Sequence, residues 1–209
     1  MEIKICGITK KYEIDKLISE TVDYAGFVVN YPKSKRNNTI SAAKELLNYV
    51  KELNEAQDGY SLKTVAVTVS PTLDEIKEIE AAGFDIIQIH GNMDEMLLHQ
   101  INIPVFRAFN VDDKSDISYI NDSKIEAILL DAKIPGHGET FDWEKYTGFE
   151  AKGKKFILAG GLNASNVKAG IEKMNPDVVD CSSGVEYEDK SIPGKDINKI
   201  EQFVKEVRR

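Results

Sequence analysis

Two residues far apart in the sequence, Cys6 and Asp131, could act together as a base and an acid. Each comes at the end of a short apolar segment, IKIC (3–6) and AILLDA (127–132). A cysteine acts as a base only as a thiolate, which needs positive or donor-rich surroundings. An aspartic acid acts as an acid only if partial burial or a nearby negative charge keeps its proton near neutral pH. By residue type alone, a structural cysteine and a capping or ion-paired aspartate are the commoner explanation.

Two glycine-containing turns late in the chain could bind phosphate. Gly160 and Gly161 end one apolar segment, and Ser182, Ser183 and Gly184 follow the next one. Glycine lets the backbone approach an anion closely and turn its N–H groups toward it. Because the two turns follow successive strands, we predict that they lie together and bind a phosphate, rather than only ending the strands tightly.

Arg36 lies in YPKSKR (31–36), a basic loop of an acidic chain. Arginine can bind a carboxylate through two parallel hydrogen bonds, so this loop is a candidate anion clamp as well as a solvated surface loop. The histidines, His90, His99 and His137, are isolated, and no HExxH, CxxC or dinucleotide-binding motif occurs. The sequence therefore predicts no metal site and no cofactor.

The elements that must position these residues alternate between strand and helix. Eight short apolar segments are typical of parallel strands covered by helices: 3–6, 24–29, 64–69, 85–89, 104–109, 127–132, 155–160 and 177–181. Helices are predicted near 13–21 and 41–53, after a Thr72–Glu75 capping box, after an N-cap at Asn163, and near the C-terminus from Ile197 to Val207. The segments after the fourth, fifth and sixth strands have weaker helical patterns.

Eight strand–helix units allow a closed (β/α)₈ barrel or an open doubly wound sheet. The open sheet usually carries GxGxxG after its first strand, whereas Gly7, Ile8 and Thr9 follow here. The glycines concentrate instead after the seventh and eighth strands, where barrels often bind phosphate. We predict a compact α/β protein, a single-domain (β/α)₈ TIM barrel over residues 1–209, with the candidate residues at the C-terminal ends of its parallel strands.

The composition argues against several classes of protein. The net charge is −8, and no basic run indicates a nucleic-acid partner. No apolar stretch approaches the roughly 20 residues that cross a bilayer, and the chain begins in a strand-like segment without a signal peptide. Two cysteines without a secretory signal indicate a reducing compartment. We expect a cytoplasmic monomer or homodimer that binds a small phosphorylated molecule.

The motifs, in their order, resemble those of the phosphoribosylanthranilate isomerase family along almost the whole chain. They are KICGIT (4–9), GFVVNYPKSKR (26–36), QIHG (88–91), LLDA (129–132), GETFDW (138–143), LAGGLNASNV (158–167), VDCSSGVE (179–186) and PGKD (193–196). The resemblance implies a cofactor-free isomerase of tryptophan biosynthesis. Its reaction would convert N-(5-phosphoribosyl)anthranilate to 1-(2-carboxyphenylamino)-1-deoxyribulose 5-phosphate.

The resemblance also implies a role for each matching residue. Cys6 would be the general base, Asp131 the general acid, and Arg36 the ligand of the anthranilate carboxylate. The phosphate would be bound by Gly160, Gly161, Ser182, Ser183 and Gly184. The acid–base pair thus becomes a specific expectation rather than one of several explanations.

Several positions depart from the family pattern. The third strand reads AVTVS (66–70), where the family often has a phenylalanine and then an asparagine. His137 and Glu139 replace small or basic residues in the loop after the sixth strand, Asn110 stands where arginine is common, and Cys181 stands where valine is frequent. Because the first and last strands of a closed barrel adjoin, Cys6 and Cys181 could be neighbours. A disulfide between them would disable the proposed base.

Two alternatives stay open at this point. Another phosphosugar-processing barrel enzyme, such as a ribulose-phosphate epimerase or an indole-glycerol-phosphate synthase, would need metal-ligating His and Asp residues or a catalytic Lys and Glu set. Neither arrangement is found in the sequence. A non-catalytic barrel that only binds a phosphorylated metabolite is the other alternative, and the presence of both Cys6 and Asp131 argues against it.

Overall fold

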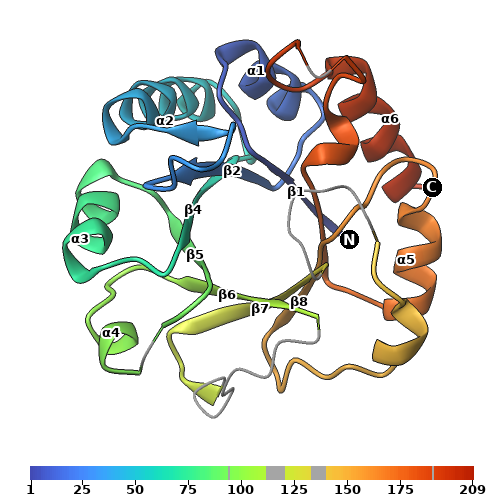
Figure 1. Ribbon diagram of the computed structural model, residues 1–209. Helices are drawn as coiled ribbons and strands as arrows, with labels where there is room; N and C mark the ends of the chain where they lie inside the picture. The colour runs from blue at the N-terminus through green and yellow to red at the C-terminus, as the bar shows by residue number, and fades with distance from the viewer. Residues whose placement is uncertain (94, 112–120, 133–139, 190) are drawn as a thin grey trace.

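The computed structural model describes residues 1–93, 95–111, 121–132, 140–189 and 191–209. Eight parallel strands close into a barrel (Figure 1): β1 (Glu2–Cys6), β2 (Tyr24–Val29), β4 (Lys63–Val69), β5 (Ile86–His90), β6 (Val105–Asn110), β7 (Ile125–Asp131), β8 (Lys155–Leu158) and β9 (Val178–Cys181). The ring closes because β1 pairs with both β2 and β9. A two-residue strand, β3 (Asn37–Asn38), pairs with the end of β2. The predicted (β/α)₈ barrel is confirmed.

Helices surround the strands on the outside of the barrel (Figure 1). They are α1 (Lys11–Ser19), α2 (Ile40–Glu55), α3 (Leu73–Ala82), α4 (Glu95–His99), α5 (Val167–Met174) and α6 (Ile197–Val207). The predicted capping box of α3 is present: the Thr72 hydroxyl accepts from the Glu75 N–H, and the Glu75 carboxylate accepts from the Thr72 N–H. None of the described helices is long and apolar enough to cross a membrane.

The helix predicted directly after Asn163 begins a turn later. Its first residue is Val167, and the N-cap position is Asn166. The Asn163 side chain caps the preceding turn instead, because its Oδ1 accepts from the Ser165 N–H at 2.8 Å. An asparagine four residues before the first residue of a helix can thus satisfy a tight turn rather than the helix itself.

Where they are described, the segments with weak helical patterns form little regular helix. After β5, α4 has only five residues. After β7, the described chain forms a 3₁₀ helix, η2 (Trp143–Tyr146). Residues 112–120, which follow β6, lie outside the described residues, as do His137 and Glu139.

The strands bury side chains on both faces, which explains their nearly continuous apolar sequences. On β1, Ile3 and Ile5 pack between the strands and the helices, whereas Cys6 belongs to the cluster inside the barrel. Lys4 lies two residues before Cys6 on the same strand and therefore also points inward. Apolar residues such as Phe106 and Leu129 fill much of the interior.

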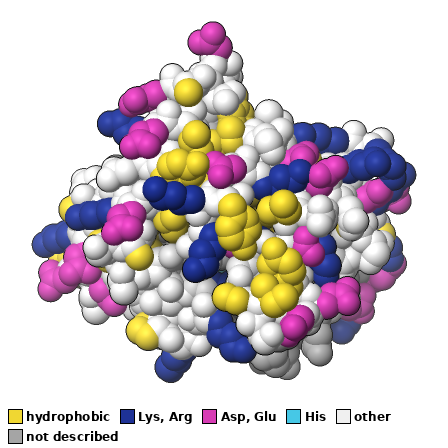
Figure 2. Space-filling view, turned by 90° about the horizontal axis from the view of Figure 1, so that it is seen from above, with side chains coloured by type: hydrophobic (Ala, Val, Ile, Leu, Met, Phe, Trp, Pro, Cys, Tyr) yellow, Lys and Arg dark blue, Asp and Glu magenta, His cyan; other side chains and the backbone are white. Residues whose placement is uncertain are grey.

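The surface carries charges of both signs. On the face at the top of Figure 1, Lys and Arg side chains are interspersed with Asp and Glu side chains (Figure 2). In the described part of that face, no continuous basic patch is visible.

Candidate active site

A cavity of about 450 Å³ opens at the C-terminal ends of the strands. It is lined by seven of the residues predicted for the site: Cys6, Arg36, Asp131, Gly160, Gly161, Ser182 and Ser183. Gly184 lines an adjoining cavity of about 700 Å³, which shares Arg36, Gly161 and Ser183 with the first. The fold therefore brings together residues from the ends of β1, β2, β7, β8 and β9.

The thiol of Cys6 is placed by a close approach between β1 and β2. Its register partner on β2 is Gly26, and a Cβ at that position would lie 2.9 Å from Cys6 Sγ and 3.0 Å from its Cα. Glycine is therefore needed at position 26 to leave room for Cys6. Burial raises the pKa of the thiol, while the positive charges of Lys4 and then Lys195 act in the opposite direction.

The carboxyl of Asp131 lies at the end of β7. Its Oδ1 accepts a hydrogen bond from the Ala132 N–H at 2.8 Å. Burial and the neighbouring carboxyl of Asp180 raise the pKa of Asp131 from 3.8 to about 6. A larger fraction of this carboxyl therefore keeps its proton near neutral pH than is usual for aspartic acid, as a general acid requires.

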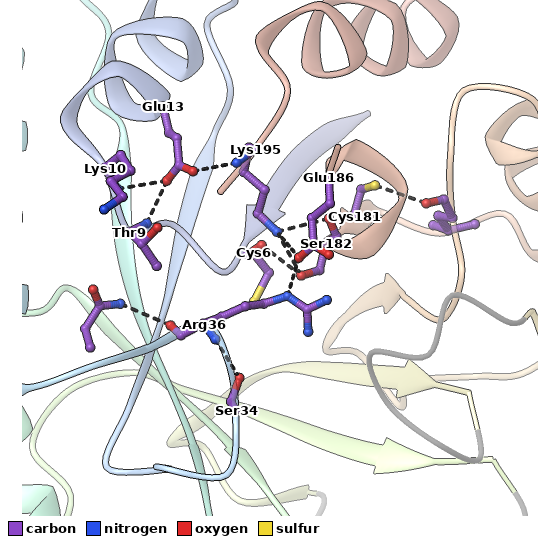
Figure 3. A network of polar contacts seen from close by, with 12 residues as sticks. Cys6, Thr9, Lys10, Glu13, Ser34, Arg36, Cys181, Ser182, Glu186 and Lys195 are labelled. Carbon is purple, nitrogen blue, oxygen red and sulfur yellow. Dashed lines mark hydrogen bonds and ion pairs between the residues drawn. The ribbon is translucent and has the colours of Figure 1, made fainter. Parts of the chain in front are cut away.

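The guanidinium of Arg36 lies across the end of β1 (Figure 3). Gly7 permits this path, because its φ is +86° and a Cβ there would lie 2.5 Å from Cδ of Arg36. Arg36 Nε donates to Glu186 Oε1 at 2.5 Å, and the same oxygen accepts from Lys195 Nζ at 3.2 Å. These contacts fix the guanidinium through Nε. Its two terminal nitrogens have no hydrogen-bond partner among the described residues and can bind a ligand carboxylate.

The turn after β8 is shaped by its two glycines. The φ angles of Gly160 and Gly161 are +85° and +65°, a region that side chains with a Cβ rarely adopt. A Cβ at position 160 would also lie 2.6 Å from the Ala132 backbone nitrogen. The turn can therefore lie close to the end of β7 and to Asp131.

The turn after β9 is tied to β1. The Ser182 hydroxyl donates to the Cys6 carbonyl at 2.9 Å and accepts from Lys195 Nζ at 3.2 Å. A 3₁₀ helix, η3 (Ser183–Val185), begins directly afterwards. Among the described residues, no acceptor is found for the N–H groups of Gly161 and Ser183, so both can donate to an anion.

Comparisons with known proteins agree with this geometry. A sequence profile of the family described as N-(5'phosphoribosyl)anthranilate (PRA) isomerase matches residues 3–206. The N-(5'-phosphoribosyl)anthranilate isomerase of Streptococcus mutans serotype c is 38% identical over 210 residues, which cover 100% of this chain and 99% of that protein. The chain belongs to the phosphoribosylanthranilate isomerase family.

Solved structures of the same family are similar over the whole chain. The crystal structure of phosphoribosyl anthranilate isomerase from Thermus thermophilus has a TM-score of 0.81 at 25% identity, covering 100% of this chain and 98% of that one. A phosphoribosyl anthranilate isomerase in complex with reduced 1-(o-carboxyphenylamino)-1-deoxyribulose 5-phosphate has a TM-score of 0.77 at 28% identity, with the same coverage.

Beside the residues expected of a phosphoribosylanthranilate isomerase, the cavity involves polar residues that sequence reasoning did not assign. Lys4 is fully buried, and its Nζ donates to Asp180 Oδ2 at 2.7 Å. Gln88 Nε2 lies 2.7 Å from His90 Nε2, and burial together with the charge of Lys4 lowers the pKa of His90 to about 3. His90 is therefore neutral at pH 7. One feature of the sequence could have identified Lys4, Gln88 and His90: each is a polar residue in a strand that is otherwise mostly apolar.

Two other residues of the barrel strands, Arg107 in the middle of β6 and Cys181 at the end of β9, lie apart from the cavity. Arg107 is 1% exposed and donates to the carbonyl oxygens of Ile89 at 2.8 Å and Gly91 at 2.5 Å, so it stabilises the end of β5. The Cys181 Sγ lies 3.0 Å from the Leu162 carbonyl oxygen, in the layer between strands and helices. Both thiols are free. Since Cys6 faces the barrel interior, the two thiols lie on opposite faces of the barrel wall, and the geometry does not favour a disulfide.

Proposed function

We propose that Asp131 and Cys6 act as the general acid and base of a phosphoribosylanthranilate isomerase. The reaction is the conversion of N-(5-phosphoribosyl)anthranilate to 1-(2-carboxyphenylamino)-1-deoxyribulose 5-phosphate, in tryptophan biosynthesis. One observation supports the roles most strongly. A carboxyl whose pKa is raised to about 6 and a thiol line the same cavity, beside an arginine held by Nε and two glycine turns.

In the first step, the Asp131 carboxyl gives its proton to the ring oxygen of the furanose. The bond between that oxygen and C1 breaks, and the nitrogen lone pair forms a C1=N bond. The product is an open-chain, protonated Schiff base, and Asp131 is left as a carboxylate. The nearby cations Lys4 and Arg36, which lower the pKa of Asp131, stabilise that charge.

In the second step, the Cys6 thiolate removes the proton from C2, which the adjacent cation makes acidic. The electrons of the C–H bond form C1=C2, and those of C1=N return to the nitrogen. The neutral enolamine then tautomerises: its C2 hydroxyl loses a proton, C1 gains one, and C2 becomes the ketone. Each positioned proton transfer contributes roughly 100- to 10,000-fold to the rate.

The two ends of the substrate are anionic, and the site offers a group for each. We assign the ring carboxylate to the terminal nitrogens of Arg36. We assign the phosphate to the turns that contain Gly160, Gly161, Ser182, Ser183 and Gly184. Binding at both ends would hold the reacting atoms between the acid and the base.

A fluorescence assay tests the proposal, because the anthranilate emission of the substrate is lost on turnover. We expect Cys6→Ala and Asp131→Asn each to lower kcat by about 100- to 10,000-fold without a change in thermal unfolding. Cys181→Ala is the matched control for loss of a thiol, since Cys181 lies outside the cavity, and it should retain normal turnover. Near-normal activity in both site variants would exclude the acid–base scheme. No turnover by the unmodified protein would favour a phosphometabolite binder.

We further propose that the protein acts in the cytoplasm, as a monomer or a homodimer. Its free thiols, Cys6 and Cys181, are compatible with a reducing compartment. Equilibrium sedimentation over a range of protein concentrations distinguishes the two assembly states. A species larger than a dimer would contradict the proposal.

A further inference from the structure

A buried ion pair lies directly below the proposed base. Lys4 on β1 and Asp180 on β9 are register partners, and their Nζ and Oδ2 atoms are 2.7 Å apart. The side chains are 0% and 8% exposed. Removing two charges from water costs about as much as their attraction returns, so a pair buried this deeply is weak evidence of a role in stability alone. Another role has to be sought in its neighbours.

A reactive neighbour of this pair is Cys6, whose side chain is hydrogen-bonded to Lys4. It follows Lys4 by two residues on the same strand, so both side chains point into the barrel, with Cys6 nearer the mouth. Burial by itself lowers the pKa of Lys4, but Asp180 and then the ionised form of Cys6 raise it above its ordinary value. Lys4 therefore stays a cation, and its charge interacts with the Cys6 thiol as well as with Asp180.

The pairing between Lys4 and Asp180 is incomplete on both sides. An ammonium group has three N–H donors, and those of Lys4 contact Asp180 Oδ2 at 2.7 Å and the side chain of Cys6. Asp180 Oδ1 is also buried without a hydrogen-bond partner in the described part of the chain. Part of the Lys4 charge is thus left to act on Cys6.

We propose that Lys4 is a positioning residue that stabilises the thiolate of Cys6, and that Asp180 fixes Lys4 and limits its effect. The proposal rests on the proposed function, in which Cys6 is the base. It gives a reason for a lysine within the otherwise apolar segment IKIC (3–6).

The other charged groups around Cys6 cannot replace Lys4 during the reaction. Arg36 and Lys195 share the Glu186 carboxylate at the mouth, and the proposed substrate brings further anions there. Asp131 faces the cavity from β7, and the neutral ring of His90 faces it from β5. Lys4 is the cation below the thiol, where substrate does not reach its fully buried side chain.

The test is the pH dependence of alkylation of Cys6 by iodoacetamide, in a Cys181→Ala background with a single thiol. We expect Lys4→Met to raise the pKa of this thiol by at least about one unit, which slows alkylation about tenfold at a fixed pH below the pKa. Lys4→Arg, which keeps the charge, should restore most of the rate. Asp180→Asn releases Lys4 from its carboxylate, so we expect alkylation to become faster.

If the role of Lys4 is electrostatic, Lys4→Met slows alkylation and Asp180→Asn makes it faster. If the role is only structural, both variants change the alkylation rate in the same direction or leave it unaffected. Because Lys4→Met leaves Asp180 buried and unpaired, the double variant Lys4→Met/Asp180→Asn supplies a second, uncharged comparison. Its thiol pKa should lie above that of Asp180→Asn alone. Equal pKa values in that comparison, or no difference between Lys4→Met and its parent, would overturn the proposal.

Lys155→Met is the matched control. Lys155 pairs with Glu2 at the other end of the barrel, so its loss should leave the alkylation profile unchanged. Alkylation measures the thiol and not turnover, so the two proposals can fail separately. If Cys6→Ala kept full activity, Cys6 would not be the base, yet the titration would still show whether Lys4 stabilises its thiolate.

Discussion

Two lysine–carboxylate pairs that both involve β1 differ mainly in their surroundings. Lys155 Nζ lies 2.9 Å from Glu2 Oε2, and Lys4 Nζ lies 2.7 Å from Asp180 Oδ2. The first pair is 35% and 38% exposed, whereas the second is 0% and 8% exposed. Water screens the first pair, so its charges matter little beyond their own contact. In the second pair, weak screening lets the lysine affect neighbouring groups such as Cys6.

The two ends of the barrel also differ in what burial does to their titratable groups. At the base, the pKa of Lys155 is raised, with Tyr24 and Glu2 as its partners, so the lysine keeps its ordinary charge. At the mouth, the pKa of Asp131 is raised to about 6, and that of Lys195 is lowered by burial. Groups shifted toward unusual protonation states are typical of catalytic sites.

The largest expected effect is at Asp131, the carboxyl at the mouth of the barrel whose pKa is raised to about 6. We expect Asp131→Asn to lower kcat/KM by about 100- to 10,000-fold. In the unmodified enzyme, kcat/KM should rise with pH through about 6, as the site loses the first of two protons shared by Asp131 and Cys6. It should fall again above the raised pKa of the thiol. The measurement is a pH profile of kcat/KM.

In Asp131→Asn the limb near pH 6 should be absent, because the remaining site proton is on the thiol. Residual activity should then increase only as Cys6 ionises at higher pH. If the limb near pH 6 persisted in this variant, another group would be its source. The acid role of Asp131 would have to be abandoned.

The second prediction compares the two ion pairs directly. We expect Lys4→Met to lower the free energy of unfolding by about 3–5 kcal/mol, because it leaves the Asp180 carboxylate buried and unpaired. Lys155→Met should cost only about 0–1 kcal/mol, since its pair is more than one-third exposed. Urea denaturation of both variants measures the difference. Equal losses would show that the surroundings of the two pairs do not differ as described.

Much of the barrel could be predicted from local patterns. The strands are predictable because parallel strands buried on both faces are nearly all apolar, and the ends of these strands carry Cys6 and Asp131. The acid–base roles came from the family resemblance and stay predictions. Residues 112–120 and the loop with His137 lie outside the described chain, so expectations there are likewise unchanged.

Contacts between distant strands could not be predicted. Lys4 meets Asp180 through a register that joins residues 176 positions apart, and no local pattern specifies that register. The role of Gly26 could not be predicted either, because this glycine leaves space for Cys6, which lies on another strand. A lysine in the apolar segment IKIC stands out in the sequence. Its partner, however, depends on the closure of the barrel, which pairs β1 with β9.

The third prediction concerns an arginine at each end of the barrel. Arg36→Met removes the proposed ligand of the substrate carboxylate, so we expect KM to rise by about 30-fold or more, equivalent to about 2 kcal/mol or more. Arg208 is the control. It donates to Thr21 at 2.9 and 2.8 Å, away from the cavity, and Arg208→Met should leave KM unchanged. A fall in kcat alone for Arg36→Met would contradict the clamp.

The smallest expected effect separates a glycine turn at the mouth from one on the surface. Gly160 and Gly83 have φ angles of +85° and +92°, so alanine at either position costs about 1–2 kcal/mol in backbone strain. A Cβ at position 160 would meet the Ala132 nitrogen at 2.6 Å, whereas one at position 83 would meet nothing within 4 Å. Gly160→Ala should therefore lose a further 1–3 kcal/mol or so of unfolding free energy and bind inorganic phosphate more weakly. Gly83→Ala should keep the phosphate affinity, which calorimetry measures. Gly83 lies at the end of α3, so strain there does not displace the turn after β8. Equal phosphate affinity in the two variants would mean that the turn after β8 does not bind the anion.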